Sequence, residues 1–240
     1  MANTKQTRGI FVASHTAKQM KIIYLCGMKR SSELSYELKT YIEQSILPMY
    51  DHFDRAHQRD HATTVIEESL KIAEHYEVDI NMVYAIAAFH DTGLTVDRAT
   101  HHLVSGKIIR EDAFLKHMFS EDEVETMAQA AEDHRASSKH EPRSIYGRIV
   151  AEADRNIDAH TIVARTIQYG LSNYPELSKD GHYKRFLEHM KEKYADGGYL
   201  KLWIPESANA NRLKAFRQLL QDEQQTKMIF EEEWLKQTER

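Results

Sequence analysis

The sequence contains little cysteine, proline or glycine. Cys26 is the single cysteine among 240 residues, so no disulfide can form within the chain, and we expect a reducing compartment such as the cytoplasm. One thiol also excludes a structural zinc site of the finger type. Four prolines and nine glycines are few for this length, so most of the chain is free to form helices.

Long apolar runs and an excess of positive charge are also absent. The longest apolar run near the N-terminus, residues 22–28, is too short to cross a membrane. The net charge of -5 argues against a non-specific nucleic-acid binder, which usually carries a basic face. Hydrophobic and charged fractions of 41% and 29% are typical of a soluble globular protein. We therefore expect neither nucleic acid nor a membrane as a partner.

Apolar residues recur at helical spacing, and no segment after residue 32 alternates as a half-buried strand does. Asp60, Asp79 and Asp158 are expected N-caps, and Ser120 with Glu123 forms an expected capping box. The expected helices cover about 32–46, 60–76, 79–91, 101–115, 120–133 and 143–156, then a segment after 158, 180–195, and one long charged helix from 207.

This pattern predicts an all-α protein. We expect a loosely ordered N-terminal segment over residues 1–31 and one helical domain over residues 32–240. The oligomeric state does not follow from the sequence.

Residues 84–93 are the most informative stretch. An apolar, alanine-rich helix ends in His90 and Asp91, and Gly93 stops it. A buried imidazole and carboxylate need a strong partner, because unpaired polar groups are expensive inside a protein. A divalent metal ion would satisfy both side chains, whereas a plain surface helix cap is the alternative. The rest of the chain decides between these interpretations.

Other metal-ligating residue types also fall at or near the ends of expected helices. Helix ends on one side of a bundle converge, and bundles build metal sites from facing helices. Imidazole and carboxylate are suitable ligands for Mn, Fe, Co, Ni or Zn, and carboxylates also bind Mg. The residues at these further helix ends are His61, His102, His134 and Asp154.

Five short segments extend this pattern. Residues 57–65 are similar to a His-x3-His-x2-Arg-Val motif with Thr64 in place of the arginine, and residues 87–91 to an apolar-His-Asp helix end. Residues 101–106 are similar to a His-x2-Ser-small motif. Residues 131–134 end in a histidine. Residues 148–155 are similar to an Asp-Ala-Asp-Arg motif, with Glu152 in place of the first aspartate.

In this order the segments resemble the HD superfamily of metal-dependent phosphohydrolases, over about residues 57–165. The resemblance implies an all-α HD domain whose divalent metal ion is held by His61, His90, Asp91 and Asp154. It further implies that His102 and His134 either hold a second metal ion or contact the phosphate. The exchange at Thr64 puts in doubt any phosphate contact that the family arginine makes.

Several residues near this motif set are candidate catalytic or binding residues. Arg135 and Lys139 follow His134 in a polar loop, so we expect them to face the metal pocket. Lys107, one turn beyond His102, is the next candidate, and a solvated surface position is the alternative for all three cations. His57 is either a polar active-site residue or the partner of a helix cap, and Asp91 is the favoured proton acceptor from an attacking water. The remaining histidines, among them His101 and His182, are expected to be surface or packing residues.

The resemblance implies hydrolysis of a phosphoester or phosphoanhydride of a small molecule, with a nucleotide as the favoured substrate. Two alternatives remain open. Some proteins of this fold hold two irons and oxidise their substrate with oxygen, and motifs alone do not separate chemistries on one fold. A regulatory module that binds nucleotides without turnover is the other alternative.

Overall fold

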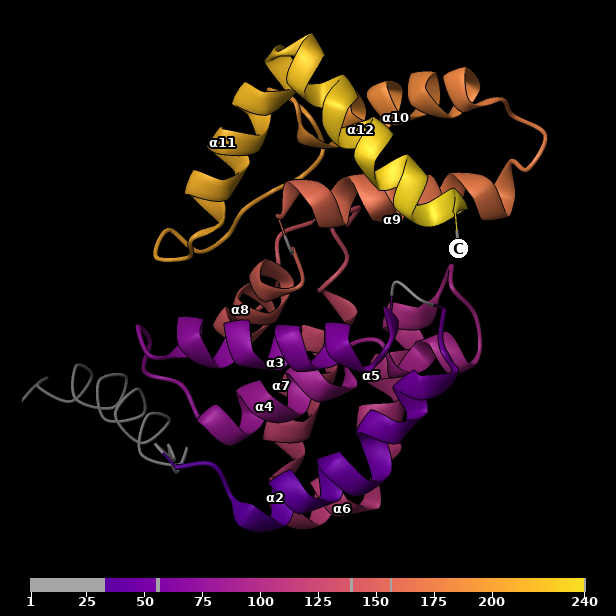
Figure 1. The fold of residues 1–240 in the computed structure, drawn as a ribbon. Coiled ribbons are helices and arrows are strands. Elements are labelled where there is room, and N and C mark those ends of the chain that lie inside the picture. Colours follow the sequence, from indigo (N-terminus) through magenta and orange to yellow (C-terminus); the bar gives the residue numbers. More distant parts are fainter. Residues whose placement is uncertain (1–32, 55–56, 139, 156, 240) are drawn as a thin grey trace, which may run out of the picture.

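The structure is a computed structural model that describes residues 33–54, 57–138, 140–155 and 157–239 (Figure 1). The expected loose segment 1–31 lies outside the described residues. Within these ranges the chain forms helices and no strand, which confirms the all-α prediction. None of the helices in these ranges combines the length and the apolar character needed to cross a bilayer.

The first region, residues 33–155, is built around α4 (Ile80–Phe89). Every residue of α4 from Asn81 to Phe89 is buried, and α4 packs against α3, α7 and α8. The other elements of this region are α2 (Tyr36–Tyr41), η1 (Ile42–Ile46), η2 (Leu47–His52), α3 (Arg59–Ala73), η4 (Thr92–Thr95), α5 (His101–Glu111), α6 (Ala113–Met118), α7 (Glu121–Glu132) and α8 (Ile145–Ala153).

The second region, residues 157–239, consists of α9 (Ala159–Asn173), α10 (Lys179–Tyr194), α11 (Asn209–Gln221) and α12 (Glu223–Thr238). Figure 1 shows these helices, in orange and yellow, grouped at one end of the molecule. Their apolar faces form a cluster of their own, centred on Phe186 and Phe230, which is separate from the cluster around α4. The predicted domain 32–240 therefore contains two hydrophobic cores.

Three of the predicted helix starts are confirmed. The side chains of Asp79 and Asp158 accept hydrogen bonds from backbone N–H groups in the first turns of α4 and α9. Ser120 and Glu123 form the reciprocal capping box of α7. The prediction for Asp60 is wrong, because α3 begins at Arg59 and Asp60 lies inside its first turn.

Two predicted helices are each broken by an aspartate. The helix expected over 101–115 ends at Asp112, whose side chain accepts from the Leu115 N–H at 2.8 Å and starts α6. The long helix expected from residue 207 ends at Asp222, which caps α12 through the Gln225 N–H at 3.0 Å. In both places a carboxylate replaces a backbone acceptor, so the chain changes direction without an unpaired donor.

A buried carboxylate joins the two regions. Glu152, in α8, accepts hydrogen bonds from the Trp203 N–H at 2.7 Å and the Ser207 hydroxyl at 2.5 Å. Its backbone carbonyl accepts from the Asn209 side chain at 2.8 Å. Ile204, between these contacts, packs into the core of the first region. The segment that leads into α11 is thus fixed to the helix that ends at the candidate site.

Candidate metal centre

Six side chains of the types that bind metal ions converge where helices of the first region begin or end. They form two groups, and the potential ligand atoms of each group lie within 4.8 Å of one another. The first group is His61, His90 and Asp154, and the second is Asp91, His101 and His134.

Asp91 lies between the two groups. Its Oδ2 is 3.3 Å from Nε2 of His90 and 3.6 Å from Nε2 of His61. Its Oδ1 is 3.2 Å from Nε2 of His101 and 3.4 Å from Nε2 of His134. A carboxylate with one oxygen toward each group has the arrangement of a ligand shared by two neighbouring ions.

Asp154 closes the first group from the side of α8. Its Oδ1 is 3.3 Å from Nε2 of His61 and 3.8 Å from Nε2 of His90, and the two Nε2 atoms are 3.3 Å apart. The Asp154 side chain keeps 21% of its surface exposed, whereas that of His90 is fully buried. Asp154 is therefore the member of this group that is accessible from solvent.

Backbone carbonyls orient three of the imidazoles. In His90, His101 and His134 the Nδ1–H donates to the carbonyl three residues earlier, at 2.8, 2.8 and 2.6 Å. Such a bond fixes the tautomer, so that Nε2 carries the free electron pair and points into the cluster. This is the arrangement that metal-ligating histidines have in proteins.

The imidazoles and carboxylates of the cluster stabilise one another's charged forms. Burial alone would lower the pKa of His61, but hydrogen bonds to Asp154 and Asp91 raise it to about 9. Burial would raise the pKa of both carboxyls, yet the surrounding imidazoles hold the pKa of Asp91 and of Asp154 below its usual range. The proton on His61 compensates part of the charge of these buried carboxylates, and a divalent cation would take its place. Nitrogen and oxygen donors without a thiolate fit such an ion.

The structure brings together the predicted ligands His61, His90, Asp91 and Asp154, with His134 beside them. In the second group His101 takes the place expected for His102. Adjacent residues of a helix point about 100° apart, so only one of the two can face Asp91. Ser105 is buried and accepts the Gly93 N–H at 2.9 Å. Because Ser105 lies four residues after His101, both side chains lie on the same face of α5, and His101 is therefore the histidine that faces Asp91.

His102 lies beside the cluster. Its ring centroid is 5.6 Å from that of His101, and its Nδ1 is buried without a hydrogen-bond partner among the described residues. Burial and the nearby charge of Arg135 lower the pKa of His102 to about 4. This imidazole is therefore neutral at ordinary pH.

Of the three predicted cations, Lys107 and Arg135 contact groups outside the cluster. The Lys107 ammonium is 70% exposed and lies 3.8 Å from the Glu111 carboxylate. Arg135 donates to the Ala99 carbonyl at 2.7 Å. Lys139 lies outside the described residues.

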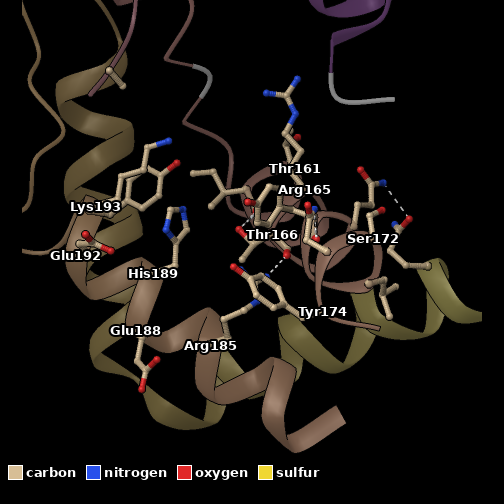
Figure 2. Close-up of a pocket in the computed structure, with 18 of the residues that line it drawn as sticks. Thr161, Arg165, Thr166, Ser172, Tyr174, Arg185, Glu188, His189, Glu192 and Lys193 are labelled. Carbon is tan, nitrogen blue, oxygen red and sulfur yellow. Dashed lines mark hydrogen bonds between the residues drawn. The ribbon is translucent and has the colours of Figure 1, made fainter. Parts of the chain in front are cut away.

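A cavity of about 1340 Å³ opens beside Asp154, between the first region and helices α9 and α10 (Figure 2). His57 lines it, with Nδ1 2.9 Å from both oxygens of Asp54, so His57 is a polar cavity residue. The cations that line this cavity are Arg98, Arg155, Arg165, Lys184, Arg185 and Lys193.

Most of these cations belong to the second region, where the sequence motifs carry no information. The only sequence signal is the spacing of Thr161, Arg165, Gln168 and Ser172, which places polar residues along one face of α9. That spacing is also the pattern of an ordinary solvated helix face. It becomes informative only once the helix is placed beside Asp154.

Comparison with known proteins gives two matches. Residues 59–156 match the family model of the HD domain. The chain is also similar to the crystal structure of a predicted HD superfamily hydrolase from an uncultured Thermotogales bacterium, at 21% identity and a TM-score of 0.42, covering 65% of this chain and 86% of that one. A search of curated proteins found no match.

Proposed function

We propose that this chain, whose residues 59–156 match the HD domain, is a metal-dependent phosphohydrolase for a small phosphate ester or anhydride. A nucleotide is the favoured substrate. The observation that carries the proposal is the position of Asp91 between two groups of ligands, next to a large cavity lined by cations.

The ligand set supports one or two divalent ions. His61, His90, Asp91 and Asp154 would hold the first, and His101 and His134 would join Asp91 at the second. A bound ion would lower the pKa of a water molecule and polarise the phosphoryl oxygens. The protein contributes imidazoles whose Nε2 atoms are already oriented by backbone carbonyls.

His57 is the proposed proton-transfer residue. Asp54 holds its Nδ1, so Nε2 is the atom that exchanges protons with a substrate in the cavity. In this role His57 would protonate the leaving oxygen. Asp91, the proton acceptor favoured by the sequence, has both carboxylate oxygens facing imidazoles, which favours a role as shared ligand instead.

The test is metal analysis of protein purified without chelator, followed by a hydrolysis screen. The screen would offer nucleoside mono-, di- and triphosphates and p-nitrophenyl phosphate with Mn, Co or Mg. We expect turnover that is lost in Asp91→Asn. Absence of turnover of every compound, with metal shown to be bound, would overturn the proposal. Nucleotide binding under those conditions would indicate a regulatory module.

The presence of two ligand groups around one carboxylate also favours the alternative of a di-iron oxygenase. Two tightly bound iron ions per chain and an absorption spectrum that changes with oxygen would identify that activity. Hydrolysis with Mn or Co in the absence of oxygen would exclude it.

A further inference from the structure

Two cations of the second region lie on the cavity side of the metal centre. The Arg165 guanidinium, from α9, is 3.4 Å from Nδ1 of His61, so it touches a ligand directly. Lys193, from α10, lines the same cavity as Asp154. Figure 2 shows Arg165 and Lys193 reaching toward this space from two different helices. Both side chains therefore line the cavity from which a phosphate would approach Asp154.

Lys193 has no anionic partner in the part of the chain that the structure describes, since its ammonium makes no ion pair or hydrogen bond there. It lies over the Tyr194 ring, 5.0 Å from the centroid. Burial lowers the pKa of Lys193, although Asp154 pulls in the opposite direction. Other lysines of this region do have partners, as Lys236 does with Glu232 at 2.6 Å. A partly buried cation without a counter-ion favours an anionic ligand.

The carboxylates near Lys193 do not supply that charge. Glu188 and Glu192 also line the cavity, but both are exposed, and neither forms an ion pair with Lys193. Asp154 raises the pKa of Lys193, while the charges of Arg155 and Arg165 lower it. Arg155, Arg165 and Lys193 thus lie around Asp154, and a cluster of cations in a cavity suits a phosphate dianion.

The same cavity has an aromatic end. Tyr169 follows Arg165 by four residues, which is about 6 Å along α9. Tyr169 and Tyr174 line the cavity with 45% and 40% of their surface exposed, and their ring centroids are 6.3 Å apart. The Arg185 guanidinium lies 5.7 and 5.6 Å from the two centroids and donates to the Thr166 carbonyl, which holds the two rings in place.

We propose that α9 and α10 recognise a nucleotide, with Arg165 and Lys193 on its phosphate and Tyr169 and Tyr174 against its base. This inference rests on the proposed function only for the position of the phosphate at the metal centre. It assigns substrate recognition to residues beyond the HD domain. The cavity of about 1340 Å³ is above the usual size for a single small ligand, so it has room for both ends of a nucleotide.

The experiment measures binding by titration calorimetry to the metal-loaded full chain. The three probes are inorganic phosphate, adenosine, and α,β-methylene adenosine diphosphate, whose P–C–P bridge resists hydrolysis. We expect the methylene analogue to bind at least roughly tenfold more tightly than phosphate, because stacking on an aromatic side chain adds affinity. Equal affinities for these two probes would overturn the role of the tyrosines.

Two sets of variants separate the two ends of the cavity. Lys193→Met should weaken binding of phosphate and of the methylene analogue by roughly tenfold or more, the scale of one charge-assisted hydrogen bond. Lys193→Arg should retain most of the affinity, and Lys191→Met, an exposed lysine on the same helix that does not line the cavity, should change neither. Unchanged phosphate affinity in Lys193→Met would overturn the phosphate site.

The double variant Tyr169→Leu, Tyr174→Leu should lower affinity for the methylene analogue and leave that for phosphate unchanged. The matching double phenylalanine variant should behave as the wild type. Turnover of p-nitrophenyl phosphate, measured in parallel, keeps the two proposals apart. Turnover without the predicted binding pattern would overturn this inference alone, and the binding pattern without any turnover would overturn the proposed hydrolase alone.

Discussion

The two regions use polar side chains in different ways. In the first region polar residues at helix ends face one another, and the buried helix α4 delivers His90 and Asp91 into a closed cluster. In the second region polar residues lie along the faces of α9 and α10 and point toward a cavity, above an aromatic core of their own. The proposed chemistry and the proposed recognition thus fall in parts of the chain with separate cores, and we expect that each part can be altered without the other.

The largest expected effect is the loss of Asp91. Asp91→Asn keeps the shape of the side chain but removes the charge that both ligand groups share. We expect bound metal and kcat/KM to fall by more than about a hundredfold, beyond the range for outer-shell partners of a metal. Elemental analysis and a hydrolysis assay measure this, with circular dichroism to check the helices. Full metal content in the variant would contradict the shared-ligand role.

The separation of the two cores is tested by Phe230→Ala. Phe230 is 1% exposed and packs against Phe186 and Tyr183, at centroid distances of 5.4 and 4.9 Å. We expect the second region to lose about 3–5 kcal/mol of unfolding free energy, the cost of a large core cavity. Denaturant titration measures the loss.

Metal content of the folded Phe230→Ala variant should stay at the wild-type level. The control is Phe89→Ala, at the end of α4 directly before His90, which should lose both stability and metal. If Phe230→Ala lost metal to the same degree, the two regions would form one cooperative unit.

The second ligand group is tested by comparing His101→Ala with His102→Ala. His101 faces Asp91 at 3.2 Å, whereas His102 makes no hydrogen bond through its buried Nδ1. We expect activity to fall by about 10–100-fold in the first variant and by much less in the second. Metal stoichiometry should follow the same order. A larger loss of activity and metal in His102→Ala than in His101→Ala would identify His102 as the ligand.

Acid should weaken the second region through His182. This imidazole is 1% exposed, and neither ring nitrogen has a hydrogen-bond partner among the described residues. Burial and Arg185 lower the pKa of His182. A lowered pKa means that the unfolded chain binds the proton more readily, so stability falls as pH drops below about 6.5 and is unaffected above it.

Trp234, whose ring lies 5.3 Å from that of His182, reports the unfolding of this region by fluorescence. The variant His182→Leu should show a weaker loss of stability between pH 7 and pH 5 than the wild type. An identical pH dependence in the two proteins would exclude His182 as the source.

The smallest expected effect is that of Arg135→Ala. The sequence predicts a loss of up to about a hundredfold for this variant, the scale of one charge-stabilising group. Because Arg135 instead donates to the Ala99 carbonyl, we now expect kcat/KM to change by less than about threefold, the scale of an ordinary surface substitution. A larger fall would place the loop of residues 135–142 at the substrate.

Much of the first region follows from the sequence. Helical periodicity predicts the fold class, and ordered motifs predict His61, His90, Asp91 and Asp154, because each motif ties a ligand to a helix end. The choice between His101 and His102 depends on the rotation of α5 about its axis, which two adjacent histidines do not define. The helix breaks at Asp112 and Asp222 do not follow from the sequence either, since an aspartate suits both a solvated helix face and an N-cap.

The second region could not be predicted in this way. Arg165 and Lys193 acquire a role only when α9 and α10 are placed against the first region, and that placement depends on contacts between residues far apart in sequence. The joint at Glu152 is an example, since its partners lie 51 to 57 residues away.

The hydrogen bonds between Glu152 and the segment before α11 have a consequence for how the substrate range of the protein can change. Glu152 stands two residues before Asp154, so the same turn of α8 anchors the second region and positions a proposed metal ligand. Its partners are one backbone N–H, one hydroxyl and one amide, at Trp203, Ser207 and Asn209. A chimera that keeps Ser207 and Asn209 but carries foreign cavity-facing residues on α9 and α10 should therefore still assemble. Under this proposal, the cavity-facing residues of α9 and α10 can be replaced as long as the hydrogen bonds to Glu152 are kept.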